Sequence, residues 1–235
     1  MKNSSINKSQ YGFYFVLPFF VTFLVFGLTP IIYSLYLSFT KWDGFSDPTF
    51  VGLANYARLL HDTFFYKAIG NTLIIWVLSI VPQLVLALAL AMILNEKFIR
   101  GKHFFRAVYY FPHIVTPVTL GVLFSLMFDW QTGSVNKFLM GLGIIDDPVN
   151  WLNSPWLSRI IVALVIMWQY FGFNMLVFIA GLQSISPELY EAAAVDGATR
   201  WKVATKITLP LLKPVLLFTF ITSIIGGLQL FDAPL

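Results

Sequence analysis

The sequence predicts an all-α polytopic membrane protein. Of its 235 residues, 58% are hydrophobic and only 11% are charged, whereas soluble domains carry about 25% charged residues. Five windows without Asp, Glu, Lys or Arg approach or exceed the ~20 residues that a spanning helix needs. We expect spanning helices at about 11–39, 69–94, 107–128, 160–182 and 214–230. Lipid is therefore the solvent for most of the chain.

Residues 1–10 form a polar segment, which we interpret as a cytoplasmic tail, and residues 11–235 form the membrane domain. The first apolar run is much longer than the 7–15 apolar residues of a secretory signal, and no small-x-small cleavage site follows it. We therefore expect an uncleaved first span. Pro18 and Pro30 are candidate kinks within it, because proline removes a helix hydrogen bond.

Polar connectors separate the next spans. The connector 41–67 is rich in turn residues, and the connector 129–158 carries three tryptophans, which are typical of a membrane–water interface. The span 107–128 is expected to be broken in its first half by a cluster of residues: Pro112, His113, Thr116 and Pro117. The span 69–94 contains the polar residues Asn71 and Gln83 and a proline at position 82.

The distribution of basic residues predicts the orientation. Ten of the 15 Lys and Arg residues lie in the N-terminal tail and the loops 95–106 and 183–213, and the other five lie on the opposite side. An excess of Lys and Arg marks the cytoplasmic side. We therefore expect a cytoplasmic N-terminus and two cytoplasmic loops. With five spans, the C-terminus falls outside.

The loop 186–214 stands out because it carries seven charged residues between two apolar runs. Ser186 is a candidate N-cap, with Pro187 at the first helical position. Gly197 is placed to end that helix in a left-handed cap. A second short amphipathic helix is expected from about Thr199 to Ile207. Pro210 and Pro214 then mark the start of the next apolar run. The residues alone leave two interpretations open: a helical loop on the membrane surface, or a docking element for another protein.

The loop resembles the EAA loop of the membrane subunits of bacterial ABC importers. That pattern has E-A-A, a glycine a few residues later, and I-x-L-P. The matching residues are Glu191, Ala192, Ala193, Gly197, Ile207, Leu209 and Pro210. Asp196 and Ala198, around the glycine, and the P-x-L-x-E sequence from position 187 fit as well. The resemblance implies that these residues dock on a cytoplasmic ATPase subunit and transmit its nucleotide-driven motion to the spans.

The resemblance extends over nearly the whole chain. The segments VLPFFVTFLVFGLTPIIYSLYLSF, FVGLANYARLL, GNTLIIW, FRAVYYFPHIVTPVTLGVLFSLMFD and GSVNKFLMGLG are similar, in order, to carbohydrate importer permeases of the MalF/UgpA-like branch. It implies the type I importer (MetI-like) permease fold, whose core has six spans. We therefore expect that the last span is missing and that the sequence is truncated. A five-span protein is the alternative.

The same resemblance implies a function and partners. The chain would form half of the translocation pathway of an ATP-driven, binding-protein-dependent importer of sugars or oligosaccharides in the bacterial plasma membrane. Its partners would be cytoplasmic ABC ATPase subunits, a second homologous permease, an extracellular or periplasmic solute-binding protein and the lipid bilayer. We expect no cofactor, no nucleic acid and no catalysis by this chain, because the sequence has no G-x-x-x-x-G-K-[ST] loop or catalytic set.

The uncharged spans indicate a neutral solute and argue against an ion-coupled carrier, which usually keeps an ionisable group in the membrane. Neutral polar and aromatic side chains are the candidates for a solute path. They are His113, Thr116, Gln169, Tyr170, Asn174 and Gln229, with Asn71, Gln83 and Phe173 as further candidates. The alternative is that these groups only hold the helices together.

Two other functions stay open at this stage. One is a stand-alone secondary carrier or channel for a neutral solute, and the other is a non-transporting membrane scaffold subunit. Co-purification with an ATPase would exclude the first. Uptake by vesicles that lack the chain would test the second.

Overall fold

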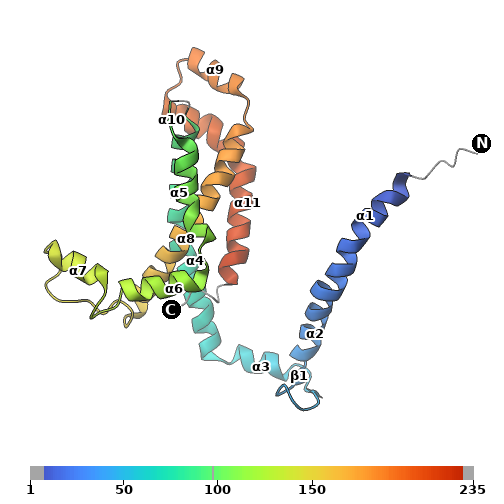
Figure 1. Ribbon diagram of the computed structural model, residues 1–235. Helices are drawn as coiled ribbons and strands as arrows, with labels where there is room; N and C mark the ends of the chain where they lie inside the picture. Colours follow the sequence, from blue (N-terminus) through green and yellow to red (C-terminus); the bar gives the residue numbers. More distant parts are fainter. Residues whose placement is uncertain (1–7, 97, 230–235) are drawn as a thin grey trace, which may run out of the picture. The chain divides into compact units, whose positions relative to one another are not determined.

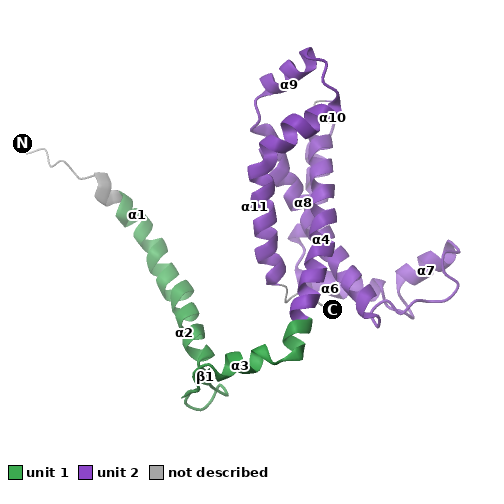
Figure 2. Cartoon of the chain, turned by 180° about the vertical axis from the view of Figure 1, so that it is seen from behind, with its two compact units in different colours: residues 1–67 green, residues 68–235 purple. Residues whose placement is uncertain are grey.

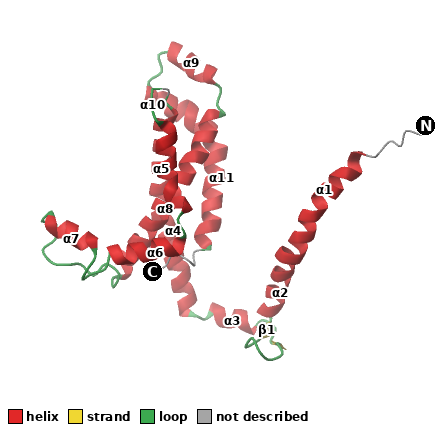
Figure 3. Cartoon of the chain, in the orientation of Figure 1, coloured by secondary structure: helices red, strands yellow, loops and turns green. Residues whose placement is uncertain are grey.

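The computed structural model describes residues 8–96 and 98–229 (Figure 1) and is helical almost throughout (Figure 3). The prediction of a mainly helical protein is therefore confirmed. The chain divides into two compact units, residues 1–67 and 68–235 (Figure 2), which we describe separately. Residues 1–7 of the predicted tail (1–10) lie outside the described residues. Position 230, at the end of the last predicted span, also lies outside them.

Unit 1 contains one long apolar helical run. Helix α1 (Lys8–Thr22), the π-helical segment η1 (Phe23–Leu28) and α2 (Thr29–Ser38) follow one another without a break. In η1 the wider turn lets the amide of Thr29 donate to the carbonyl of Leu24, to which the Thr29 hydroxyl also donates at 2.8 Å. Pro30 comes directly afterwards and has no amide hydrogen to donate, yet the chain stays helical through α2.

The rest of unit 1 folds back on the end of α2. Strands β1 (Thr40–Lys41) and β2 (Thr49–Phe50) pair antiparallel, and α3 (Ala54–Leu60) follows them. The amide of Asn55 donates to the carbonyls of Ser38 at 2.9 Å and Thr40 at 2.8 Å. This side chain therefore fixes the start of α3 against the end of the apolar run.

Asp43 closes the loop between the two strands. Hydrogen bonds from the amide and the hydroxyl of Ser46, and from the amide of Phe45, lower the pKa of Asp43 to about 2. The carboxylate is therefore charged at neutral pH and can act as the acceptor that holds this turn.

Unit 2 contains most of α4 and all the later helices. Their bounds are α4 Thr63–Asn95, α5 Lys102–Ile114, α6 Pro117–Met127, α7 Ser134–Gly141, α8 Pro155–Gln183, α9 Pro187–Val195, α10 Arg200–Val203 and α11 Leu209–Leu228. The π-helical segment η2, Ala204–Thr208, joins α10 to α11. Helices α4 and α8 extend beyond the windows expected at 69–94 and 160–182 at both ends. Among the described residues, four helices are long and apolar enough to cross a membrane, or five if α5 and α6 form one span.

The span expected at 107–128 is not one straight helix. It starts earlier, at Lys102, and α5 and α6 meet at an angle of 91°. The break lies at Val115 and Thr116, which are both extended, with ψ angles of 137° and 143°. Pro117 disfavours a helical conformation in the residue before it, which explains the position of the break. Pro112, in contrast, is accommodated inside α5.

The separate helix expected from about Thr199 to Ile207 is instead the start of the last span. Helix α10, η2 and α11 form one continuous 29-residue helix, Arg200–Leu228. Pro210 does not end it. In the π turn before this proline, the amide of Leu209 donates to the carbonyl of Ala204. Pro30 likewise follows a π turn, and the helix continues past both prolines.

The core of unit 2 lies between α4, α8 and α11. Ala87, Met175, Phe178 and Leu212 are fully buried there. Small residues contribute to this core: Ala87 and Ala91 of α4 are fully buried in it, and Gly181 of α8 lies close to the side chains of Leu212 and Val215 on α11. The same cluster includes Leu94, Leu182, Ile99 and Ile185, so the α4–α5 loop lies at the same end of unit 2 as the α8–α9 loop.

At the other end of unit 2, one buried amide organises the connector around α7. Asn136 is 3% exposed. It donates to the carbonyls of Trp130 and Val149, and its oxygen accepts from the Val149 amide and from the indole nitrogen of Trp151 at 2.7 Å. This connector is therefore a folded element, although it contains only one short helix.

Helices α5 and α8 lie very close to each other at Gly172. A Cβ at position 172 would run into the backbone carbonyl of Tyr109, which cannot move as a flexible side chain does. Gly172→Ala should therefore force α5 and α8 apart and destabilise the fold by about 1–3 kcal/mol. The matched control is Gly70→Ala in α4, where a Cβ meets nothing within 4 Å.

The measurement is the thermal unfolding midpoint of both variants in detergent. Gly172→Ala should lower it and Gly70→Ala should leave it close to that of the wild type. Equal midpoints for the two variants would show that the close approach of the helices is not required.

Candidate functional site

Helix α9 is the centre of the predicted loop, and the sequence determines both of its ends. It begins after Ser186, with Pro187 at the first helical position and Glu188 in the first turn. Ser186 occupies the N-cap position as expected, but its side chain makes no capping hydrogen bond. The fixed φ of proline and the negative charge in the first turn therefore favour the start of α9.

The C-terminal end of α9 is a Schellman motif. Gly197 has a φ of 68°, the left-handed conformation that glycine adopts most readily. Its amide donates to the carbonyl of Ala194, and the amide of Ala198 donates to the carbonyl of Ala193 at 2.9 Å. These bonds satisfy the last carbonyls of α9 and turn the chain sharply toward α10.

The loop is attached to the bundle on one side and exposed on the other. Ala193 is buried, and Ile207 and Leu209 are half-buried. The hydroxyl groups of Tyr190 and Thr208 lie 3.4 Å apart and connect α9 to the long helix that follows. The remaining predicted loop residues are Glu191, Ala192, Asp196, Gly197 and Pro210, which are exposed, and Ala198, which is half-buried.

Three large apolar side chains are exposed on the same loop. Val195 is 88% exposed, Trp201 77% and Leu189 45%. Glu188 and Glu191 lie beside them on α9 and are also exposed. The loop thus presents apolar and acidic groups together, on a short helix whose ends are fixed. Such a surface suits a protein partner better than bulk water.

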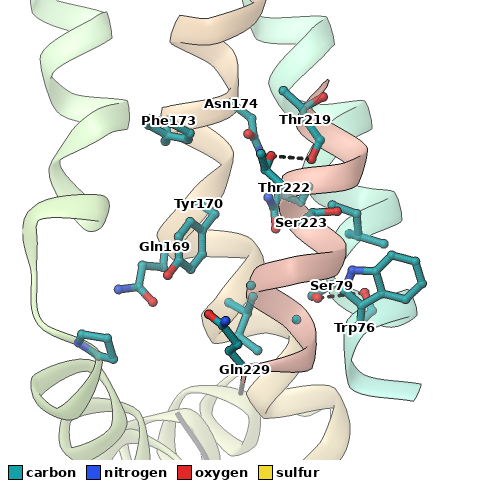
Figure 4. Close-up of a pocket in the computed structure, with 16 residues that line it drawn as sticks. Trp76, Ser79, Gln169, Tyr170, Phe173, Asn174, Thr219, Thr222, Ser223 and Gln229 are labelled. Atoms are coloured by element: carbon teal, nitrogen blue, oxygen red, sulfur yellow. Dashed lines mark hydrogen bonds between the residues drawn. The ribbon is translucent and has the colours of Figure 1, made fainter. Parts of the chain in front are cut away.

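A cavity of about 300 Å³ lies between the spanning helices of unit 2 (Figure 4). Three helices line it with residues at the spacing i, i+3, i+4, i+7, which forms one stripe along a helix. The stripes are 76, 79, 80 and 83 on α4, 166, 169, 170 and 173 on α8, and 219, 222, 223 and 226 on α11. Pro117 of α6 and Gln229 also line the cavity.

The cavity is uncharged, since none of its described lining residues is acidic or basic, and polar groups are set in a mainly apolar lining. The hydroxyl groups of Ser79, Thr222 and Ser223 donate to carbonyls of their own helices, so their oxygens remain available as acceptors. Gln83 and Asn174 are only 4% and 6% exposed, and their amides have no hydrogen-bond partner in the described part of the chain. The cavity can therefore both donate and accept hydrogen bonds.

The structure brings some of the predicted path residues together at this cavity. Gln169, Tyr170, Asn174 and Gln229 line it, as do Phe173 and Gln83. The amide of Gln169, however, donates to the carbonyl of Val115 at 3.3 Å, so it satisfies the backbone at the break between α5 and α6. This side chain fills the structural role that the sequence left open as an alternative.

Two predicted path residues are not among those that line the cavity. Thr116 is the N-cap of α6, where its hydroxyl oxygen accepts from the amide of Thr119 at 3.4 Å. His113 instead packs against two of the aromatic residues that line the cavity. Its ring stacks on Phe173 with 4.9 Å between centroids and meets the ring of Tyr170 edge-on at 5.2 Å. Asn71 lies elsewhere, in a separate groove.

Sequence reasoning missed the hydroxyl groups of α11 and the indole of Trp76. The signal was present, because Thr219, Thr222 and Ser223 recur at helical spacing within an apolar run. Trp76 has no such signal. It lies against α11 because Gly227 leaves space for its ring, and its buried Nε1 has no partner among the described residues.

Comparison with known proteins identifies the family of this chain. Residues 57–235 match the family model described as "Binding-protein-dependent transport system inner membrane component". The chain is 39% identical over 221 residues to the lactose transport system permease protein LacF of Rhizobium radiobacter, a match that covers 94% of this chain and 74% of that protein. It is 37% identical over 227 residues to the arabinooligosaccharides transport system permease protein AraP of Bacillus subtilis, covering 96% and 71%.

The fold has a solved counterpart as well. A chain in the crystal structure of a bacterial ABC transporter involved in the import of the acidic polysaccharide alginate superposes with a TM-score of 0.80 at 30% identity, covering 96% of this chain and 76% of that chain. That transporter is also known in complex with an alginate pentasaccharide-bound periplasmic protein. With apolar helices that fit several membrane spans, this chain is a multi-pass membrane protein and belongs to the family of binding-protein-dependent transport system inner membrane components.

Proposed function

We propose that this chain is a permease subunit of an ATP-driven importer for neutral sugars or oligosaccharides. It forms half of the translocation pathway, and a separate cytoplasmic ATPase drives it by alternating access. The other half is a second, homologous permease subunit. The family membership supports the transport role, and the geometry of the loop and the cavity supports the finer statements.

One observation carries the proposal: the helix Arg200–Leu228 belongs to both candidate sites. Its first turns form the end of the loop and are tied to α9 through Tyr190 and Thr208. Farther along, Thr219, Thr222 and Ser223 line the cavity. A continuous helix transmits a displacement of one end to the other, so a force on the loop would change the shape of the cavity.

The loop is the proposed docking site of the ATPase. The side chains of Leu189, Val195 and Trp201 would be buried against the partner, and Glu191 would make a charge-assisted hydrogen bond at the edge. The loop lies on the side of the membrane domain that carries ten of the 15 Lys and Arg residues. This excess of basic residues supports a cytoplasmic position for the loop and for the N-terminus.

The cavity supports an uncharged, hydroxyl-bearing solute. Amides and hydroxyl groups hydrogen-bond sugar hydroxyls, and the rings of Tyr170 and Phe173 offer apolar faces. A charged solute would lack a counter-charge at this depth, and burial of an unpaired charge is costly. Relatives named for lactose and arabinooligosaccharide transport support a sugar. The complex of the alginate importer with a periplasmic protein supports delivery by an external solute-binding protein.

The decisive experiment is reconstitution in proteoliposomes with the partner permease, the ATPase and the solute-binding protein of the same system. Sugar uptake should require ATP inside the vesicles and the binding protein outside. Uptake by this chain without an ATPase would contradict the proposal.

Gly197→Val should uncouple ATP hydrolysis from uptake. A β-branched residue at φ 68° is strained by about 1–2 kcal/mol, and loss of the left-handed cap changes the direction of the loop. The matched control is Gly143→Val. Gly143 ends α7 in the same Schellman geometry, with a φ of 67° and open space around a Cβ, but at the other end of unit 2.

Both variants should be measured for uptake and for ATPase activity in the reconstituted system. Gly197→Val should lose most uptake, and Gly143→Val should retain it. Normal uptake by the Gly197 variant would show that the cap has no role in coupling.

Glu191→Gln should weaken binding of the ATPase, because a charge-assisted hydrogen bond contributes about 1.5–3 kcal/mol, or roughly 10- to 100-fold in affinity. Asp147→Asn is the control, since Asp147 is also an exposed acidic residue but lies in the connector between α7 and α8, outside the loop. Binding of the purified ATPase to the permease in nanodiscs measures both. Equal affinities for the two variants would remove Glu191 from the interface.

Asn174→Ala should reduce sugar uptake about tenfold at low solute concentration, which corresponds to one lost hydrogen bond of about 1.4 kcal/mol. Gln169→Leu should instead lower the unfolding midpoint, because it leaves the carbonyl of Val115 without a partner. Uptake kinetics and thermal unfolding of both variants separate the two roles. An Asn174 variant that transports normally would place the solute path elsewhere.

A further inference from the structure

A second groove, apart from the cavity, lies between α4, α6 and α8 at the end of unit 2 where α8 begins. Its volume is about 350 Å³. Arg159 is its only charged lining residue and is half-buried, so the groove holds one positive charge and no acidic group.

The guanidinium is held in a fixed position from two sides. Its Nε donates to the side-chain oxygen of Asn71 at 3.1 Å. The guanidinium carbon lies 5.0 Å from the centre of the Trp156 ring, one turn earlier on α8. An arginine that only reaches for water needs neither contact, whereas a fixed, planar fork is suited to bind an anion.

The polar groups of the groove that have no partner among the described residues are all hydrogen-bond donors. Asn71 uses its oxygen for Arg159, so its NH₂ group is left, together with the two terminal nitrogens of the guanidinium. These groups have no hydrogen-bond partner in the described part of the chain. The hydroxyl groups of Ser125 and Ser158 already donate to backbone carbonyls. Several free donors and a positive charge favour a ligand with several acceptor oxygens and a negative charge.

The depth of the groove distinguishes between possible anions. Helix α8 has 29 residues and is about 43 Å long, whereas the hydrocarbon layer is about 30 Å thick. Arg159 lies about 6 Å from the start of α8, in the part that exceeds the hydrocarbon layer. Trp156, 57% exposed, marks the same depth. Lipid phosphates lie at this depth, just outside the hydrocarbon layer. Farther into the membrane, the wall of the groove is apolar, with Ile75 and Val162.

We propose that this groove binds a phospholipid, with the head-group phosphate on Arg159 and Asn71 and an acyl chain along Ile75 and Val162. The site is separate from the sugar cavity, whose lining residues it does not share. The bound lipid supplies the negative charge that the groove lacks, and it connects α4 to α8.

The test compares lipids that differ only in the phosphate. The full chain, with the subunits that co-purify with it, is delipidated in detergent and titrated with phosphatidylglycerol or with diacylglycerol of the same acyl chains. Phosphatidylglycerol should raise the unfolding midpoint and remain bound in native mass spectrometry, whereas diacylglycerol should do neither. Arg159→Gln should weaken phosphatidylglycerol binding about 10- to 100-fold, as expected for the loss of a charge-assisted contact.

Two further variants keep the test decisive. Lys137→Gln removes a positive charge from α7, outside the groove, and should bind lipid as the wild type does. Asn71→Leu keeps the guanidinium but removes its partner, at an exposed position that should tolerate the change, and should weaken binding less than Arg159→Gln.

Three results would overturn the proposal. Equal stabilisation by diacylglycerol would mean that the groove only accepts apolar chains. Stabilisation by inorganic phosphate or an acidic oligosaccharide, but not by phosphatidylglycerol, would mean that the ligand is a soluble anion. An unchanged lipid affinity in both groove variants would mean that Arg159 only joins α4 to α8.

Discussion

The hydrocarbon layer gives a backbone carbonyl no hydrogen-bond partner, and the structure of this chain follows from that constraint. At the break between α5 and α6, the side chain of Gln169 supplies the donor for Val115. At Pro30 and Pro210, a π turn precedes the proline and the chain stays helical past it. The same requirement thus has two solutions: a side chain from a neighbouring helix at the break, or a helix that continues past the proline.

The second solution makes the proposed coupling possible. If Pro210 ended the helix, the loop and the last span would be separate elements joined by a hinge. Because the chain stays helical from Arg200 to Leu228, the residues next to α9 and those that line the cavity lie on one continuous helix. Gly197 then determines the direction of α9, since its left-handed conformation fixes the turn between α9 and that helix.

The sequence predicts the helices, the loop and its left-handed cap well, because each depends on a local pattern: an uncharged window, a proline after an N-cap, or a glycine after a helix. It predicts the site less well. Gln169 and Asn174 look equivalent in the sequence, as two amides in one apolar run. Only the tertiary structure shows that Gln169 donates to the carbonyl of Val115, whereas Asn174 lines the cavity without such a partner among the described residues. The break between α5 and α6 follows from the local effect of Pro117 and was expected, but its angle of 91° was not. The polar stripe of α11 was readable from its spacing.

The cavity and the groove of unit 2 differ in charge, because only the groove has a charged lining residue. None of the described residues that line the cavity is charged, which favours the neutral solute that we propose. Arg159 lies near the end of α8, where the head-group layer can compensate its charge. If this arginine lined the cavity, an acidic solute would be favoured instead. Its position away from the cavity is therefore consistent with a neutral sugar as the solute and an anionic lipid as the neighbour.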